Sequence, residues 1–111
     1  MDKLFVYGSL MPHQKNFFIL KDIPGNWQKA FIFGFIKKIK LEKDFLYDAI
    51  ILNSNKNKVN GYLLTSYALK NFWKKIDYFE SENYCRLKTD VFILNRQKTQ
   101  ANLYVLKQPK L

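Results

Sequence analysis

The stretch that decides the fold reads Lys3-Leu4-Phe5-Val6-Tyr7-Gly8-Ser9-Leu10. A short run of β-forming residues that stops at Gly and Ser is typical of a buried strand followed by a turn, so we predict a first strand over residues 3–7. Glycine lets a backbone approach a ligand, and successive exposed N–H groups can form a nest for an anion such as a carboxylate. Taken alone, an ordinary turn is the commoner explanation of these residues.

Further strand-like segments indicate a mainly antiparallel sheet. They cover residues 27–39, 45–52, 59–64, 87–94 and 101–106. Gly34 interrupts the first of these, which predicts one bent strand or two. The second and third are separated by a polar segment and are expected to form a hairpin, as are the last two. Since no βαβ alternation is present, the expected class is α+β: a mixed, mainly antiparallel sheet curled into a small barrel, with one main helix.

The main helix is expected over residues 67–80, with Ser66 as its N-cap, because neither Gly nor Pro interrupts this stretch. At about 100° per residue, one apolar stripe contains Leu69, Phe72, Trp73 and Ile76. Glu80 falls about 20° from Leu69 on the same wheel, within that stripe. A carboxylate that faces a core has a raised pKa, as a general base working near neutral pH requires. The alternative is that the helix ends near Tyr78 and that Glu80 turns into water or pairs with Arg86.

Length and composition fit one folded domain over residues 1–111, with 48% hydrophobic and 17% aromatic residues. The formal charge of +10 would suit a nucleic acid, for which Tyr62, Phe92 and Tyr104 could serve as stacking platforms. However, the lysines are scattered along the chain, as is typical of a solvated surface. Binding of nucleic acid is therefore the less favoured hypothesis.

The single cysteine, Cys85, excludes an intrachain disulfide, and no His or Cys stands beside it at metal-ligand spacing, so no metal site is expected. We expect Cys85 to pack on its strand. The only histidine, His13, has no Ser or Cys signature beside it, so a hydrolase triad is not expected and His13 reaches at most the rim of a pocket. No apolar run approaches the ~18 residues of a membrane span, and no signal peptide is visible, so a cytoplasmic location is expected.

Three segments, in this order, together resemble the γ-glutamylcyclotransferase-like family: Phe-Val-Tyr-Gly-Ser-Leu (5–10), Ile-Asp-Tyr-Phe-Glu-Ser (76–81) and Tyr-Cys-Arg (84–86). Weaker agreement between them extends the resemblance over essentially the whole chain. The Phe-Glu-Ser sequence at 79–81 is most similar to the γ-glutamylamine cyclotransferase branch, and small bacterial members are equally similar. Two departures, Met-Pro-His at 11–13 and Asp48, stand where relatives often carry a basic residue with Gly and a Pro, and they bear on the leaving group.

The resemblance implies an enzyme that cleaves a γ-glutamyl amide by intramolecular cyclisation to 5-oxoproline and a free amine, without metal or cofactor. In that reading the N–H groups of Gly8, Ser9 and Leu10 hold the α-carboxylate, and Tyr7 lines the pocket. Glu80 takes a proton from the α-ammonium and returns it to the departing amine.

The resemblance also suggests roles for three neighbouring residues. Tyr84 is expected near the pocket, where it could donate to substrate. Arg86 either orients Glu80 or forms a structural ion pair, and the ion pair is favoured. Asp77 is expected to bond nearby backbone. A catalytically silent protein of the same fold that binds a small molecule remains the main alternative to an enzyme.

Overall fold

The computed structural model describes residues 1–42, 45–52, 57–95 and 97–107. Over these residues the chain forms six strands, one α-helix and two short 3₁₀ helices. In chain order they are β1 (Asp2–Val6), η1 (Phe17–Ile19), β2 (Asn26–Glu42), β3 (Phe45–Leu52), β4 (Lys58–Ser66), η2 (Leu69–Asn71), α1 (Trp73–Glu80), β5 (Tyr84–Ile93) and β6 (Lys98–Leu106).

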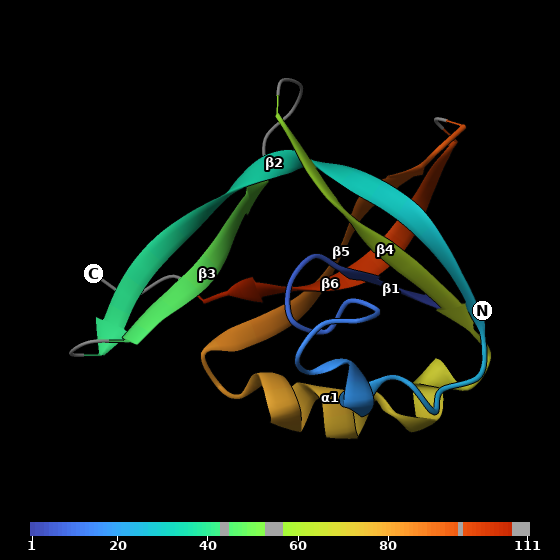
Figure 1. The fold of residues 1–111 in the computed structure, drawn as a ribbon, viewed down its shortest axis with the longest axis horizontal. Coiled ribbons are helices and arrows are strands. Elements are labelled where there is room, and N and C mark those ends of the chain that lie inside the picture. The colour runs from blue at the N-terminus through green and yellow to red at the C-terminus, as the bar shows by residue number, and fades with distance from the viewer. Residues whose placement is uncertain (43–44, 53–56, 96, 108–111) are drawn as a thin grey trace.

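Five of the strands close into a small barrel. Their order is β2-β4-β1-β6-β5, and β5 returns to β2 through the pairs Ala30↔Ile93 and Phe31↔Phe92. The pair β1–β6 is parallel and the other pairs are antiparallel, so the sheet is mixed. Helix α1 lies below the barrel, and β3 extends away from it with the second half of β2 (Figure 1). The expectation of an α+β fold with a mainly antiparallel barrel and one main helix is confirmed.

The strand β2 changes partner along its length, which corrects one predicted hairpin. Residues 26–33 pair with β4, whereas β3 pairs with the part of β2 that begins at Gly34. The segments 45–52 and 59–64 therefore do not form a hairpin with each other: a single strand of 17 residues is long enough to pair with both. Gly34 lies where the partners change, and a Cβ there would stand 2.5 Å from the Ile51 carbonyl oxygen. The region predicted as one bent strand or two is one strand. The predicted hairpin of β5 and β6 is confirmed.

The strand β1 is buried on both faces, which explains its unbroken apolar run. Phe5 packs inside the barrel with residues from all the other barrel strands, whereas Leu4 and Val6 face a second core between the barrel wall and α1. Gly61 on β4 faces this strand. A Cβ on Gly61 would overlap the Val6 carbonyl oxygen and lie 2.8 Å from Phe5 Cζ. The chain leaves β1 between the two cores, at the position where the site is built.

The helix is shorter than predicted, because Ser66 ends β4 instead of capping α1. The Ser66 hydroxyl donates to the Pro24 carbonyl and accepts the Ala68 N–H at 2.9 Å, so it caps a turn at the end of the strand. The predicted apolar stripe nevertheless faces the second core, and both Leu69 and Ile76 are fully buried. Neither α1, with eight residues, nor any other described helix has the length and apolarity needed to cross a membrane.

Candidate active site

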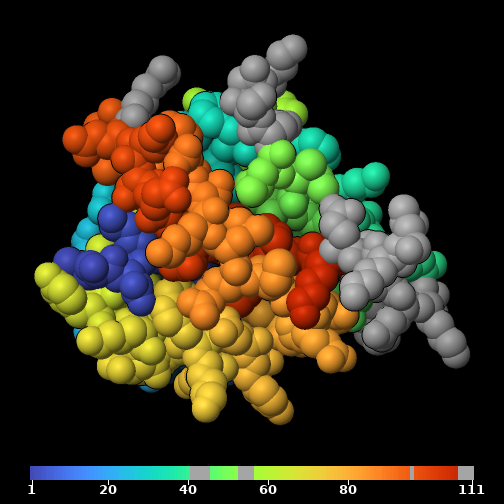
Figure 2. All heavy atoms as spheres, turned by 180° about the vertical axis from the view of Figure 1, so that it is seen from behind, coloured from blue at the N-terminus to red at the C-terminus, as the bar shows by residue number. Residues whose placement is uncertain are grey.

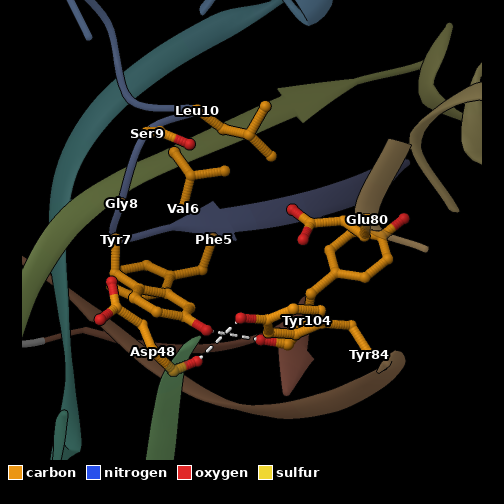
Figure 3. A pocket seen from close by; sticks show the side chains of 10 residues that line it. All are labelled: Phe5, Val6, Tyr7, Gly8, Ser9, Leu10, Asp48, Glu80, Tyr84 and Tyr104. Atoms are coloured by element: carbon orange, nitrogen blue, oxygen red, sulfur yellow. Dashed lines mark hydrogen bonds between the residues drawn. The ribbon is translucent and has the colours of Figure 1, made fainter. Parts of the chain in front are cut away.

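A cavity of about 100 Å³ opens where β1 ends (Figure 3). Its wall combines the turn after β1 with parts of β3, α1, β5 and β6. The lining residues are Phe5, Val6, Tyr7, Gly8, Ser9, Leu10, Asp48, Glu80, Tyr84 and Tyr104. A space of this volume holds several water molecules and thus a compact polar group. The structure therefore brings together the residues that the sequence singled out at positions 7–10, 80 and 84.

Glu80 is the last residue of α1 and is partly buried. Its carboxylate points across the cavity toward the segment that runs from Val6 to Leu10 (Figure 3). Among the described residues no hydrogen bond or ion pair reaches this carboxylate, and burial raises the pKa of Glu80 to about 7. At neutral pH both the acid and the carboxylate are populated, so this group can accept a proton and give it back.

The turn after β1 faces Glu80 with unused backbone donors. The Gly8 carbonyl accepts the Met11 N–H at 3.0 Å, and the Ser9 carbonyl accepts the Asn16 N–H at 2.8 Å. These bonds hold the turn through its carbonyl groups. No amide of residues 8–10 donates to another described residue, so all three N–H groups are free for a ligand. A Cβ on Gly8 would meet no atom within 4 Å, so this glycine leaves open space beside the amides. The φ of Gly8 is not positive, so the backbone conformation does not itself require glycine.

Two tyrosines form the wall beside Glu80, and their protons are already in use. The Tyr7 hydroxyl donates to the Tyr104 carbonyl at 2.7 Å, and the Tyr84 hydroxyl donates to the Asp48 carbonyl at 3.0 Å (Figure 3). Burial, followed by the charge of Glu80, raises the pKa of Tyr84 to about 12. The pKa of Tyr7 is also raised above its ordinary value. Burial is the largest cause, and electrostatic repulsion from Tyr84 and then from Glu80 adds to it. Both hydroxyls therefore keep their protons at neutral pH and offer only lone pairs to a ligand. Tyr84, expected to donate to substrate, donates here to the protein backbone.

Arg86 and Asp77 lie outside the cavity and pair with each other. Arg86 Nε and Nη2 stand 3.2 Å and 3.3 Å from the Asp77 carboxylate, and the guanidinium lies 4.1 Å above the Trp73 ring. Arg86 therefore forms the ion pair that was favoured and does not contact Glu80. The expectation that Asp77 bonds nearby backbone is wrong. Besides pairing with Arg86 of β5, its carboxylate accepts a hydrogen bond from the Tyr104 hydroxyl of β6 at 2.5 Å.

The sequence pattern gave no catalytic or substrate-binding role to two polar cavity residues: Tyr104, and Asp48, which stands out only as a departure from the family. Tyr104 lies opposite Arg86 in the β5–β6 register, so a correct hairpin alignment could have found it. Asp48 is on β3 and reaches the cavity because β3 pairs with the second half of β2. One Asp48 carboxylate oxygen is buried and lies 2.5 Å from Lys38 Nζ, an ion pair without hydrogen-bond geometry.

The remaining candidates stand apart from the cavity. His13 is exposed with a φ of 69° and does not line it. Cys85 is exposed, contrary to the expectation that it packs, because its face of β5 is open to solvent at that end of the strand. Within the described parts of the chain, no three His, Cys, Asp or Glu side chains meet as metal ligands.

Two of the three aromatic residues considered as platforms for nucleic-acid bases are already engaged. Tyr104 is only 5% exposed, and the Phe92 ring stacks on Phe31 with centroids 5.4 Å apart. A buried or already stacked ring offers no free face to a base. The stacking surface proposed for single strands therefore loses two of its three rings.

Comparison with known proteins identifies one family. A family model described as "Gamma-glutamyl cyclotransferase, AIG2-like" matches residues 4–111. No match is found among curated proteins.

Solved structures share the fold. YkqA from Bacillus subtilis is similar with a TM-score of 0.70 and 20% identity, over 99% of this chain and 37% of that protein. At3g28950.1 from Arabidopsis thaliana is similar with a TM-score of 0.63 and 29% identity, over 95% of this chain and 61% of that protein. PH0828 from Pyrococcus horikoshii, described as uncharacterized, is similar with a TM-score of 0.61 and 17% identity, over 99% of this chain and 82% of that protein. The chain thus spans less than two thirds of the first two proteins.

Proposed function

Because the chain belongs to the γ-glutamyl cyclotransferase, AIG2-like family, we propose that it is an enzyme that converts a γ-glutamyl amide into 5-oxoproline and a free amine. The observation that carries the proposal is the position of Glu80, whose carboxyl titrates near neutral pH and faces three free backbone amides. A base on one wall and anion donors on the other suit a substrate that carries both an ammonium and a carboxylate.

The substrate is proposed to bind with its α-carboxylate on the N–H groups of Gly8, Ser9 and Leu10. Its α-ammonium then lies near Glu80 and near the hydroxyl oxygens of Tyr7 and Tyr84, which can accept but not donate. This arrangement folds the glutamyl chain so that its nitrogen can reach its own γ-carbonyl carbon. Holding the two ends of one molecule together supplies much of the rate through effective molarity.

The proposed reaction needs one proton carrier. Glu80 removes a proton from the α-ammonium, the neutral amine attacks the γ-carbonyl carbon, and a new C–N bond closes a five-membered ring. The bond from that carbon to the leaving nitrogen then breaks, and protonated Glu80 gives its proton to the departing amine. The ring nitrogen gives its extra proton to the regenerated Glu80 carboxylate, which leaves one N–H in the lactam. Tyr7 and Tyr84 cannot take this role near neutral pH, because the pKa of each is raised by burial. The reaction class requires neither metal nor redox cofactor.

The test is to incubate the purified protein with γ-glutamyl dipeptides and with γ-glutamyl-ε-lysine, and to measure 5-oxoproline by mass spectrometry. General acid–base catalysis contributes about 10²–10⁴-fold, so Glu80→Gln should lose at least about 100-fold in turnover. Glu82→Gln is the matched control, since this exposed glutamate lies two residues further on and outside the cavity.

Two results would contradict the mechanism: no product from any donor, or equal product from Glu80→Gln and the wild type. Binding of 5-oxoproline without turnover would instead identify a protein of the same fold that binds a small molecule without catalysis. Where no product forms, calorimetry measures whether 5-oxoproline binds to the protein.

A further inference from the structure

The helix that carries Glu80 is too short to hold its own position. An isolated helix below about 12 residues is marginal in water, so α1, with eight residues, depends on contacts with the barrel. Its first turn is tied to β1, since Trp73 Nε1 donates to Asp2 Oδ2 at 2.9 Å, and Ile76 is fully buried in the second core. Glu80 lies in the last turn, beyond both of these attachments.

Asp77 is the only described residue of this last turn whose side chain forms a hydrogen bond or ion pair with the barrel. Its carboxylate accepts the Tyr104 hydroxyl from β6 at 2.5 Å and faces the Arg86 guanidinium from β5 at 3.2 Å. In the view from behind, the side chains of α1 and of β5 meet along one face of the molecule (Figure 2). Asp77 precedes Glu80 by three residues, so the two side chains are neighbours on the helix surface.

Tyr104 connects this contact to the cavity. Its ring lines the cavity, its hydroxyl reaches out to Asp77, and its main-chain carbonyl accepts the Tyr7 hydroxyl at 2.7 Å (Figure 3). Burial, together with the hydrogen bond to Asp77, raises the pKa of Tyr104 above its ordinary value, so the hydroxyl keeps the proton that it donates. One buried residue thus joins the α1 side of the cavity to the β1 side.

We propose that Asp77, acting through Tyr104 and Arg86, is a positioning residue that fixes the end of α1 so that the Glu80 carboxylate faces the cavity. Asp77 does not line the cavity and so does not touch the substrate. The inference rests on the proposed function, because Glu80 is the group being positioned. Without the Asp77 contacts the last turn of α1 can fray, and Glu80 can turn from its partly buried position into water.

A purely structural role for Asp77 makes a different prediction. In that case its loss lowers stability, but the folded molecules keep Glu80 in the same environment. The pKa of Glu80 is therefore the deciding quantity. The other titratable groups around it are Tyr7, Asp48, Tyr84 and Tyr104; the three tyrosines keep their protons well above neutral pH.

The experiment is a pH titration of the glutamate carboxyl carbons by NMR without substrate. The chain has only three glutamates, so Glu80→Gln assigns the signal. In Asp77→Ala we expect the pKa of Glu80 to fall from about 7 by at least about one unit toward its ordinary value. With γ-glutamyl donors, kcat should fall about tenfold or more, while KM changes less than about threefold because the amides of the turn are untouched. Asp90→Asn is the matched control, since Asp90 pairs with Lys98 at the far end of the same hairpin.

A second variant covers the case in which Asp77→Ala does not fold. Tyr104→Phe keeps the ring and removes only the hydroxyl, and it should move the pKa of Glu80 in the same direction. A folded Asp77→Ala, or a Tyr104→Phe, in which Glu80 still titrates as in the wild type overturns the proposal. The titration needs no turnover, so if the wild type forms no 5-oxoproline the proposed function fails while the role of Asp77 is still decided.

Discussion

Replacing Glu80 with Gln should remove activity and at the same time stabilise the protein at high pH. In the folded state burial raises the pKa of Glu80 from 4.5 to about 7. Between these two values the folded protein binds a proton that the unfolded chain has lost. The free energy of unfolding therefore falls as the pH rises through this window, and the loss is complete above about pH 7. Gln does not ionise and escapes this loss.

The magnitude follows from the size of the pKa shift. One unit corresponds to about 1.4 kcal/mol, so a shift from 4.5 to about 7 amounts to about 3 kcal/mol. This is a large share of the roughly 5–15 kcal/mol by which a domain is stable. Any loss of packing caused by the amide itself is the same at all pH values. The difference in unfolding free energy between Glu80→Gln and the wild type should thus shift by about 3 kcal/mol in favour of Gln between pH 4 and pH 8.

Urea unfolding followed by circular dichroism measures this difference at a series of pH values. All other acidic groups titrate in both proteins and cancel in the comparison. Glu82→Gln, at an exposed position outside the cavity, is measured beside Glu80→Gln as the matched substitution. If the Glu80→Gln difference is flat to within about 0.5 kcal/mol, the carboxyl titrates as it does in water, and the argument from burial fails.

The remaining predictions concern the cavity and its turns. The wild-type kcat/KM should rise with pH through about 7, as Glu80 loses its proton. A kcat/KM that stays constant within the assay error from about pH 5.5 to about pH 8.5 would contradict this. Gly8→Ala should leave stability within about 0.5 kcal/mol but raise KM several-fold, because the methyl group enters open space beside the amides; an unchanged KM argues against binding there. Gly61→Ala should lose about 3 kcal/mol or fail to fold, since its Cβ overlaps the Val6 carbonyl, and a wild-type melting temperature would refute this. Ser81→Gly should gain about 1 kcal/mol, because φ 74° and ψ 175° form a region nearly exclusive to glycine; a lower melting temperature would count against strain.

Some of the site was predictable from local pattern. The wheel that starts at Leu69 placed Glu80 toward the core, and this holds although the segment divides into a 3₁₀ turn and a shorter helix. Both forms keep the apolar side chains on one face, so the burial pattern survives the change in helix type. The turn at Gly8 was visible in the same way, as a strand that stops at small residues.

Local pattern predicted the strand pairing correctly for β5 and β6 but not for β3 and β4. The polar segment before Lys58 suggested a hairpin of β3 with β4, but both strands pair with the long strand β2. Asp48 was therefore not placed at the cavity, which it reaches through the pairing of β3 with the second half of β2. A polar segment between two strand-like runs predicts a hairpin only where no third strand competes for the pairing. β5 and β6 therefore pair as predicted, whereas the long strand β2 pairs with both β3 and β4.

The sequence by itself determined which faces of β1 and α1 are buried, and hence that a turn and a carboxylate were the candidates for chemistry. The tertiary structure decided what surrounds them. The arrangement of the strands directed the Tyr7 and Tyr84 protons to backbone carbonyls, left the amides of the turn free and set Asp77 against Tyr104 of β6 and Arg86 of β5. Periodicity records the burial of a residue against its neighbours along the chain. Hydrogen-bond partners can instead lie far apart in the sequence, and Tyr7 and Tyr104 are separated by 97 positions.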